Sequence, residues 1–242
     1  MKKKLLSLAV ASLVCGSIAE ARFYVGVDLG YSGAMFYGGG SGMYYEVPKT
    51  EALKYIFKTI KETNNGVSAT LEPFMGFNAS VNFGAEDFYL NNHLGFRWGA
   101  SVGYTTLSQM AQFKSQGAYG TETSSTIEEY NYLDFGLSLD VIVNLWSDES
   151  SSVGVFGGVE GEYHYFLSGR YDDYLYDIYQ TFKGIHSYGV NGQVGISTLI
   201  ANHHRVDLTA KLPILIAGNN GDYGMASYLV KTSFNVGYKY VF

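Results

Sequence analysis

Side chains suited to acid–base chemistry occur at alternate positions around residue 162. Glu160, Glu162 and His164 would share one face of a β-strand, because successive side chains of a strand point to opposite faces. Paired carboxylates do general acid–base work when their environments separate their pKa values. His164 could instead act as the base for Ser168 in acyl hydrolysis, which needs a serine, a base and an orienting group in contact. Because proximity in sequence does not establish that contact, we expect no catalytic residue and no enzyme, and keep a membrane-embedded hydrolase as an alternative.

Two further motifs could bind a metal or a nucleotide. His203 and His204 could ligate a metal, but adjacent histidines in a short turn are more often solvated. Gly38-Gly39-Gly40, with Gly42 just beyond, lacks the strand–GxGxxG–helix context of a nucleotide-binding loop and indicates backbone flexibility. We therefore expect no metal site and no cofactor.

The strand pattern that would position such groups is clearest at residues 227–242, where two kinds of side chain alternate. One face is polar and rich in small residues. The other face is apolar with aromatic residues at both ends: Tyr228, Val230, Thr232, Phe234, Val236, Tyr238, Tyr240 and Phe242. This pattern predicts a membrane β-strand with lipid on one side, a polar lumen on the other and aromatic girdles at the interfaces. An aromatic residue closing such a strand is also a signal for the bacterial outer-membrane assembly machinery.

An export signal is predicted at residues 1–21. Lys2, Lys3 and Lys4 precede a short apolar stretch, and Ala19-Glu20-Ala21 forms an A-x-A cleavage site. The apolar stretch of about 14 residues is too short to span a bilayer comfortably. Cys15 raises a lipoprotein alternative, but the large Leu13 and Val14 before it make a poor lipobox. We expect a cleaved signal peptide at 1–21 and one barrel domain at 22–242.

The alternating pattern recurs in eight segments. They are 22–33, 67–84, 94–106, 130–145, 153–167, 185–200, 205–216 and 227–242. The connections alternate between short (85–93, 147–152 and 201–204) and long (34–66, 107–127, 168–184 and 217–225). This asymmetry is typical of short periplasmic turns and longer exterior loops. We predict an all-β, eight-stranded antiparallel transmembrane outer-membrane β-barrel with long extracellular loops. Pro73 and Pro213 fall near the long-loop ends of their strands, and Thr50–Glu62 has the spacing of a short helix in the first loop.

Charged residues recur on the face of these strands that would point inward. The predicted interior network comprises Asp28, Glu72, Arg97, Asp134, Asp140, Glu160, Glu162, Lys211 and Lys231, together with Arg205, Asp207 and Lys239. Counted from the turns, they divide into three levels of mixed sign, as expected for charges that must be paired away from water. The middle level holds three carboxylates and one lysine, which suggests that a proton, water or cation is needed there. An eight-stranded lumen is just wide enough for side chains to fill, so a structural network is favoured over a permeation path.

The third long connection is rich in tyrosine. Its candidate interaction surface comprises Tyr171, Tyr174, Tyr176 and Tyr179. Tyrosine combines a rigid apolar ring with a hydrogen-bonding tip, which suits recognition surfaces. The same residues are also favoured at the lipid headgroup interface, so both interpretations stay open.

Several motifs together resemble the Helicobacter outer membrane protein family. They are the strand Leu94-Gly95-Phe96-Arg97-Trp98-Gly99, the strand Tyr132–Asp140, the "GVFGG" segment Val153–Val159, the "K-[VIL]-P" segment Lys211-Leu212-Pro213-Ile214 and the aromatic terminal strand. The similarity covers roughly 81–242 and implies an outer-membrane β-barrel. Larger members of the family are adhesins or proposed porins. This chain lacks their large insertion with cysteine pairs, so no binding residue is carried over.

Composition agrees with this interpretation. The chain has 30 glycines, 22 tyrosines and only 3 prolines, and its net charge of −6 does not favour binding to nucleic acid. We expect a monomer in the cell outer membrane, with a structural or surface-interaction role through its extracellular loops. A narrow porin for small solutes is the alternative. The expected partners are outer-membrane lipid, the outer-membrane assembly machinery and an unidentified extracellular ligand.

Overall fold

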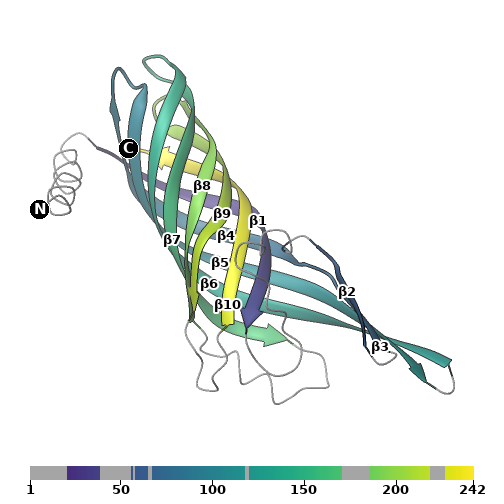
Figure 1. Cartoon of the computed structure of the whole chain (residues 1–242). Coiled ribbons are helices and arrows are strands. Elements are labelled where there is room, and N and C mark those ends of the chain that lie inside the picture. Colours follow the sequence, from purple (N-terminus) through teal and green to yellow (C-terminus); the bar gives the residue numbers. More distant parts are fainter. Residues whose placement is uncertain are drawn as a thin grey trace, which may run out of the picture.

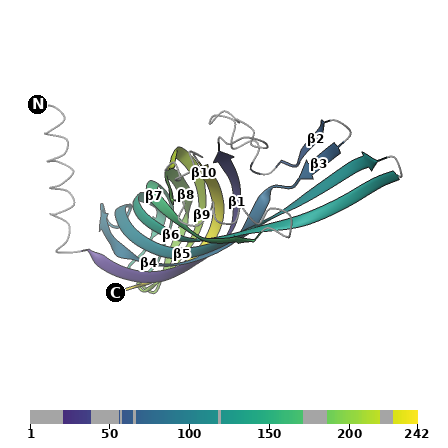
Figure 2. The same ribbon diagram turned by 90° about the horizontal axis from the view of Figure 1, so that it is seen from below.

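The computed structural model describes residues 21–38, 56, 58–64, 67–117, 120–170, 186–218 and 227–242. Their strands roll into a barrel from which one part of the sheet projects (Figures 1 and 2). The strands are β1 (Arg22–Gly38), β2 (Ile60–Asn64), β3 (Val67–Leu71), β4 (Phe74–Tyr89), β5 (Leu94–Gly117), β6 (Gly120–Ser147), β7 (Ser152–Arg170), β8 (His186–Ile200), β9 (His204–Gly218) and β10 (Ser227–Val241). No helix among the described residues is long and apolar enough to cross a membrane.

Eight of these strands close into the barrel. Their order is β5-β4-β1-β10-β9-β8-β7-β6, and the pairing of β5 with β6 completes the ring. Every ladder is antiparallel, and the β1–β10 ladder runs from Tyr24↔Val241 to Gly38↔Ser227. Closure satisfies the backbone hydrogen bonds of the wall without leaving an edge in lipid. The predicted eight-stranded barrel is therefore confirmed.

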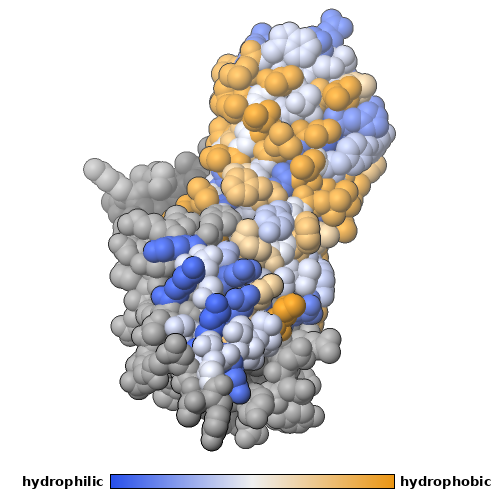
Figure 3. All heavy atoms as spheres, turned by 90° about the vertical axis from the view of Figure 1, so that its right-hand side faces the viewer, coloured by the Kyte–Doolittle hydropathy of each residue, from blue (hydrophilic) through white to orange (hydrophobic). Residues whose placement is uncertain are grey.

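Side chains alternate across the wall because lipid and lumen impose opposite requirements. Leu29, Phe77 and Leu137 point outward with 63 %, 68 % and 71 % of their surface exposed. Tyr24, Asn82 and Asp140, on the other face of their strands, are buried. In Figure 3 apolar side chains gather on the upper part of the visible face, and hydrophilic ones lie below, toward the projecting sheet. The outward row of β10 departs from the pattern at its start, because Val230 and Thr232 are buried there like Lys231 between them.

Three described turns join strands at one end of the barrel: Leu90–His93, Asp148–Ser151 and Ala201–His203. Leu90, Asn91 and Asn92 have φ of 53°, 55° and 65°, so the first three residues of the first turn are left-handed. Asparagine tolerates this conformation through local hydrogen bonding, whereas leucine does not favour it. The turns are shorter than the sequence predicts, because the strands pair almost to their ends.

The other end of the barrel differs from the prediction. The segment 107–127, expected to be a loop, continues the β5–β6 ladder as far as Gly117↔Gly120. The β2–β3 hairpin joins this extension, with β3 pairing along β5 from Val67↔Ser115 to Leu71↔Ala111. We call these parts of β2, β3, β5 and β6 the projecting sheet (Figures 1 and 2). Outside lipid a strand does not need an apolar face, so its period-2 hydrophobic signal disappears.

Two other local predictions are resolved by the ladders. The predicted helix Thr50–Glu62 is wrong over 60–62, which belong to β2; residues 50–55 and 57 lie outside the described part. Pro73 interrupts the predicted strand 67–84, with β3 on one side and β4 on the other. Pro213 stays within β9, paired with Asn191 next to a register shift that accommodates its missing N–H. The predicted signal peptide is also outside the described residues, apart from Ala21.

Candidate functional site: two ion-pair clusters in the lumen

The predicted interior charges form two clusters. The lower cluster, nearer the short turns, comprises Arg22, Asp28, Glu86, Arg97, Asp140, Arg205, Asp207 and Lys239. The upper cluster comprises Asp134, Glu160, Glu162, His164, Lys211 and Lys231. The strand periodicity predicts which face these residues occupy, and the ladder registers bring residues distant in sequence into contact.

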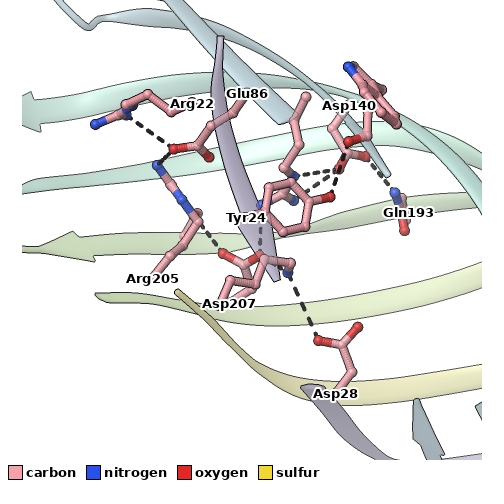
Figure 4. Close-up of polar contacts among 12 residues, drawn as sticks. Arg22, Tyr24, Asp28, Glu86, Asp140, Gln193, Arg205 and Asp207 are labelled. Atoms are coloured by element: carbon pink, nitrogen blue, oxygen red, sulfur yellow. Dashed lines mark hydrogen bonds and ion pairs between the residues drawn. The ribbon is translucent and has the colours of Figure 1, made fainter. Parts of the chain in front are cut away.

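Asp207 on β9 is the centre of the lower cluster (Figure 4). Its Oδ2 accepts hydrogen bonds from Arg97 Nη1 at 2.7 Å and Lys239 Nζ at 2.5 Å, and its Oδ1 accepts one from Ser197 Oγ at 2.6 Å. Arg97 also donates from Nε to Asp140 Oδ2 at 3.0 Å. These residues come from β5, β6, β8, β9 and β10, so the pairs tie opposite walls of the barrel together.

Glu86 on β4 extends the cluster toward the short turns. Its Oε1 accepts hydrogen bonds from Arg205 Nη2 at 2.9 Å and Arg22 Nη2 at 3.1 Å. The guanidinium carbons of Arg22 and Arg205 also lie 5.3 Å and 5.5 Å from the ring centre of Phe88, within cation–π range. The sequence analysis placed Glu86 in a turn. One feature of the sequence could have shown that Glu86 points inward. It lies two residues before Phe88, at one of the alternate positions that face the lumen, on a strand that runs longer than predicted.

The upper cluster is built around two lysines. Lys211 Nζ lies 2.5 Å from Glu160 Oε2 and 3.5 Å from Glu162 Oε1. Lys231 Nζ lies 3.3 Å from Asp134 Oδ2 and 3.4 Å from Glu162 Oε2. Ion pairs buried in this way hold charges that would be costly alone.

His164 completes the upper cluster. Its Nδ1 lies 2.5 Å from Asp134 Oδ1, and its Nε2 lies 3.5 Å from Glu162 Oε2. Both ring nitrogens therefore face carboxylates.

An apolar cluster lies next to the upper ion pairs. It comprises Ala34, Leu107, Tyr130, Tyr132 and Phe166, all buried. The Tyr132 ring meets His164 edge-on, with ring centres 5.6 Å apart. This cluster lies in the lumen on the side of the projecting sheet.

A small cavity lies where the two ion-pair clusters meet. Its volume is about 40 Å³, and Asp28, Asn82, Arg97, Glu160 and Lys211 are among its lining residues. That volume suits about one water molecule. The Asn82 amide nitrogen and oxygen are buried without a hydrogen-bond partner among the described residues, so this side chain supplies a donor and an acceptor for such a molecule.

Most of the predicted interior residues lie in the lumen. Arg97, Asp134, Asp140, Glu160, Glu162 and Lys231 are buried, and the side chains of Asp28 and Lys211 are 21 % and 17 % exposed. The prediction that Glu72 points into the lumen is wrong, because Glu72 is exposed and lies between β3 and β4, next to Pro73. The residues predicted for the middle level, Asp28, Asp140, Glu160 and Lys211, line the same small cavity, and the ion pairs Arg97–Asp140 and Lys239–Asp28 link this level to the lower one.

The alternatives that involve catalysis or metals gain no support from the geometry. Both ring nitrogens of His164 face carboxylates, which leaves neither free to serve Ser168 as a base. Gly99–Gly103 reads G-x-S-x-G around Ser101, but the segment is a continuous strand paired with β4 and β6, without the strand-to-helix turn of a nucleophile elbow.

The adjacent histidines make separate contacts. His203 Nδ1 lies 2.8 Å from Val241 O, and His204 Nδ1 lies 2.8 Å from Tyr238 Oη. The part of the chain that the structure describes holds no group of three or more potential metal ligands. Gly39, Gly40 and Gly42 lie outside the described residues, as do all four tyrosines of the predicted interaction surface.

Comparison with known proteins agrees with the fold. The family described as Helicobacter outer membrane protein matches residues 80–242. The chain belongs to this family. Its place is therefore the outer membrane, in contact with lipid. No curated protein matches the chain in sequence.

Two solved outer-membrane barrels show distant similarity to this family member. Ail, the attachment invasion locus protein of Yersinia pestis, is 10 % identical, with 90 % of this chain and 98 % of Ail covered and a TM-score of 0.30. The outer membrane protease OmpT from Escherichia coli is 9 % identical, with 91 % and 97 % covered and a TM-score of 0.39. Both similarities are too distant to carry an argument about binding or catalysis.

Proposed function

We propose that this family member is a non-enzymatic, non-conducting outer-membrane barrel that acts through its extracellular parts, with the barrel as their anchor. The observation that supports this most directly is the filled lumen. Two ion-pair clusters and an apolar cluster occupy it in succession along the axis. The projecting sheet lies on the side opposite the short turns, which corresponds to the cell exterior in barrels of this kind.

The filled lumen disfavours the narrow porin on energetic grounds. A solute would have to displace side chains that are hydrogen-bonded across the barrel, such as Arg97, Asp207 and Lys239. Breaking a buried pair by removing one partner costs about 3–5 kcal/mol. The neighbouring cavity has room for about one water molecule rather than a continuous wet path. The barrel therefore serves better as a rigid support than as a pore.

Single-channel recording of the refolded protein in planar bilayers tests this proposal. Folding is verified first by heat-modifiable gel mobility, and we expect no conductance steps from the folded protein. Tyr132→Ala combined with Arg97→Ala, which removes side chains from the apolar and the lower cluster, provides the comparison in which steps should emerge. Leu139→Ala on the lipid face is the matched control and should stay silent. Steady ohmic steps from the unaltered protein would refute the proposal and establish the porin.

A further inference from the structure

One edge of the projecting sheet is open. Residues 120–128 of β6 pair with β5 along one side, from Gly117↔Gly120 to Gln109↔Glu128. On the other side the first pair with β7 is Glu129↔Arg170. Among the described residues no strand pairs with 120–128 on that side. A strand edge of this kind presents a row of N–H and C=O groups to any extended chain that reaches it.

Apart from its two glutamates, the segment 120–128 carries few of the features that protect an exposed edge against pairing. Proteins block exposed edges with lysine, proline, a bulge or a very short strand. The segment 120–128 reads GTETSSTIE and contains neither lysine nor proline. Its ladder with β5 is free of register shifts, and its threonines and Ile127 favour an extended backbone. The edge is thus competent to accept another strand.

The charge of the edge indicates what kind of strand it accepts. Residues 120–128 contain two acidic residues, Glu122 and Glu128, and no basic residue. Glu122 is exposed. Opposite charges on neighbouring strands are favourable, and like charges directly opposite are unfavourable.

We propose that residues 120–128 of β6 bind an extended, lysine- or arginine-rich segment of a partner protein by strand addition. Main-chain hydrogen bonds would supply affinity, and the glutamates of the edge would select basic side chains on the added strand. This inference rests on the proposed function, because it assigns the extracellular interaction to one edge of the projecting sheet.

Two other occupants are less compatible with the charges. Residues 171–179 follow β7 directly in sequence, but they contain Asp172, Asp173 and Asp177 and would bring further negative charge to an acidic edge. A second copy of the same edge would also bring glutamates against glutamates. The charge balance therefore favours a basic partner over either of these.

The test uses the full barrel refolded in phospholipid nanodiscs and a synthetic peptide of alternating lysine and threonine, as long as the edge. Two control peptides are matched to it, one with glutamate in place of lysine and one N-methylated at alternate backbone nitrogens. Binding is measured by fluorescence anisotropy, and hydrogen exchange locates the bound peptide. We expect the lysine peptide to bind and to protect amides within 120–128, and both control peptides to bind at least about tenfold more weakly.

Matched variants of the chain complete the test. Glu122→Lys should weaken binding of the lysine peptide about tenfold, whereas Ser150→Lys in the distant turn should leave it unchanged. If the N-methylated peptide binds as well as its parent, strand addition is refuted and only surface attraction remains. If deletion of 171–179 strengthens binding about tenfold or more, the chain's own segment is the occupant. A dimer that the peptide dissociates would likewise overturn the proposal in favour of a second copy.

Failure of the strand-addition proposal and failure of the proposed function would give different experimental results. A conducting barrel would refute the non-porin function whatever the peptide does. A silent barrel that shows no protection at 120–128 would refute the strand-addition site and leave the anchoring role intact.

Discussion

Removing the charge of Asp207 while keeping its shape should destabilise the barrel strongly. The carboxylate is 1 % exposed and accepts hydrogen bonds from Arg97, Lys239 and Ser197. In the lower cluster four cations face four carboxylates, so Asp207→Asn leaves one buried positive charge uncompensated. Hydrogen bonds to charged groups contribute about 1.5–3 kcal/mol each, and all three are accepted by the charged carboxylate. We expect the free energy of unfolding to fall by about 3–5 kcal/mol.

The assay is equilibrium unfolding of the refolded barrel from phospholipid vesicles in guanidinium chloride, followed by tryptophan fluorescence. Glu149→Gln removes one carboxylate charge from an exposed turn and should change the free energy of unfolding by less than about 0.5 kcal/mol. Adding Lys239→Met to Asp207→Asn restores the charge balance, so the double variant should be less destabilised than the sum of the single variants, by about 1–3 kcal/mol. A loss below about 1 kcal/mol for Asp207→Asn would refute the reasoning, because the pairs would then behave like surface salt bridges.

Three other perturbations address the turn, the lumen and the lipid face. Hydrogen bonds from two backbone amides of its turn hold the pKa of the Asp148 carboxyl below its usual value. The stability contributed by Asp148 is therefore present above about pH 4 and lost as the pH falls through the lower folded-state pKa. Carbon NMR of the labelled Asp148 carboxyl should show this lowered pKa. Asp148→Asn should remove the part of the pH-dependent stability that this carboxyl contributes. Gly84→Ala would place a methyl group 2.1 Å from Trp98 O and should lower the free energy of unfolding by about 1–3 kcal/mol or prevent folding. The control Gly161→Ala places its methyl group in open space and should fold normally in the gel-mobility assay. Equal yields of the two folded variants would contradict the close packing at Gly84. Leu137→Arg, at an outward position 71 % exposed, should cost about 2–4 kcal/mol if it lies near the bilayer midplane, and a neutral result in vesicle unfolding would place it outside the lipid.

The wall of the barrel could be predicted because lipid leaves few choices. Every spanning strand must present apolar side chains outward, and Phe23, Val25, Val27, Leu29 and Tyr31 on β1 do so at alternate positions. The order of the ring followed from sequential antiparallel pairing. Where the strands leave the membrane this constraint ends. The β5–β6 extension is built from polar residues that a loop would also use, so its ladder has no distinctive sequence signal.

The sequence predicted which charged residues face the lumen, but not which residues they contact there. Parity along a strand shows that Arg97 and Asp140 point inward, and their contact follows once Arg97↔Asp140 is known to be a ladder pair. Longer contacts, such as Arg97 with Asp207, depend on the registers of several ladders and on the barrel's closure. The prediction for Glu72 was wrong for a different reason. Its parity is correct for an inward position, but the strand that would carry it ends at Leu71.

Closure of the barrel by β1 and β10 also has a consequence for how the chain folds. The hairpins between successive strands form between neighbours in sequence, whereas the β1–β10 ladder joins Val27 to Tyr238, nearly the whole length of the chain away. Bringing such distant segments together carries a large entropic cost, and topologies dominated by non-local pairing fold slowly. Until that seam closes, β1 and β10 are both unpaired edges that can recruit wrong partners. The β1–β10 seam is therefore where assembly is most exposed to error, and where a chaperone or insertion machine would protect the chain most effectively.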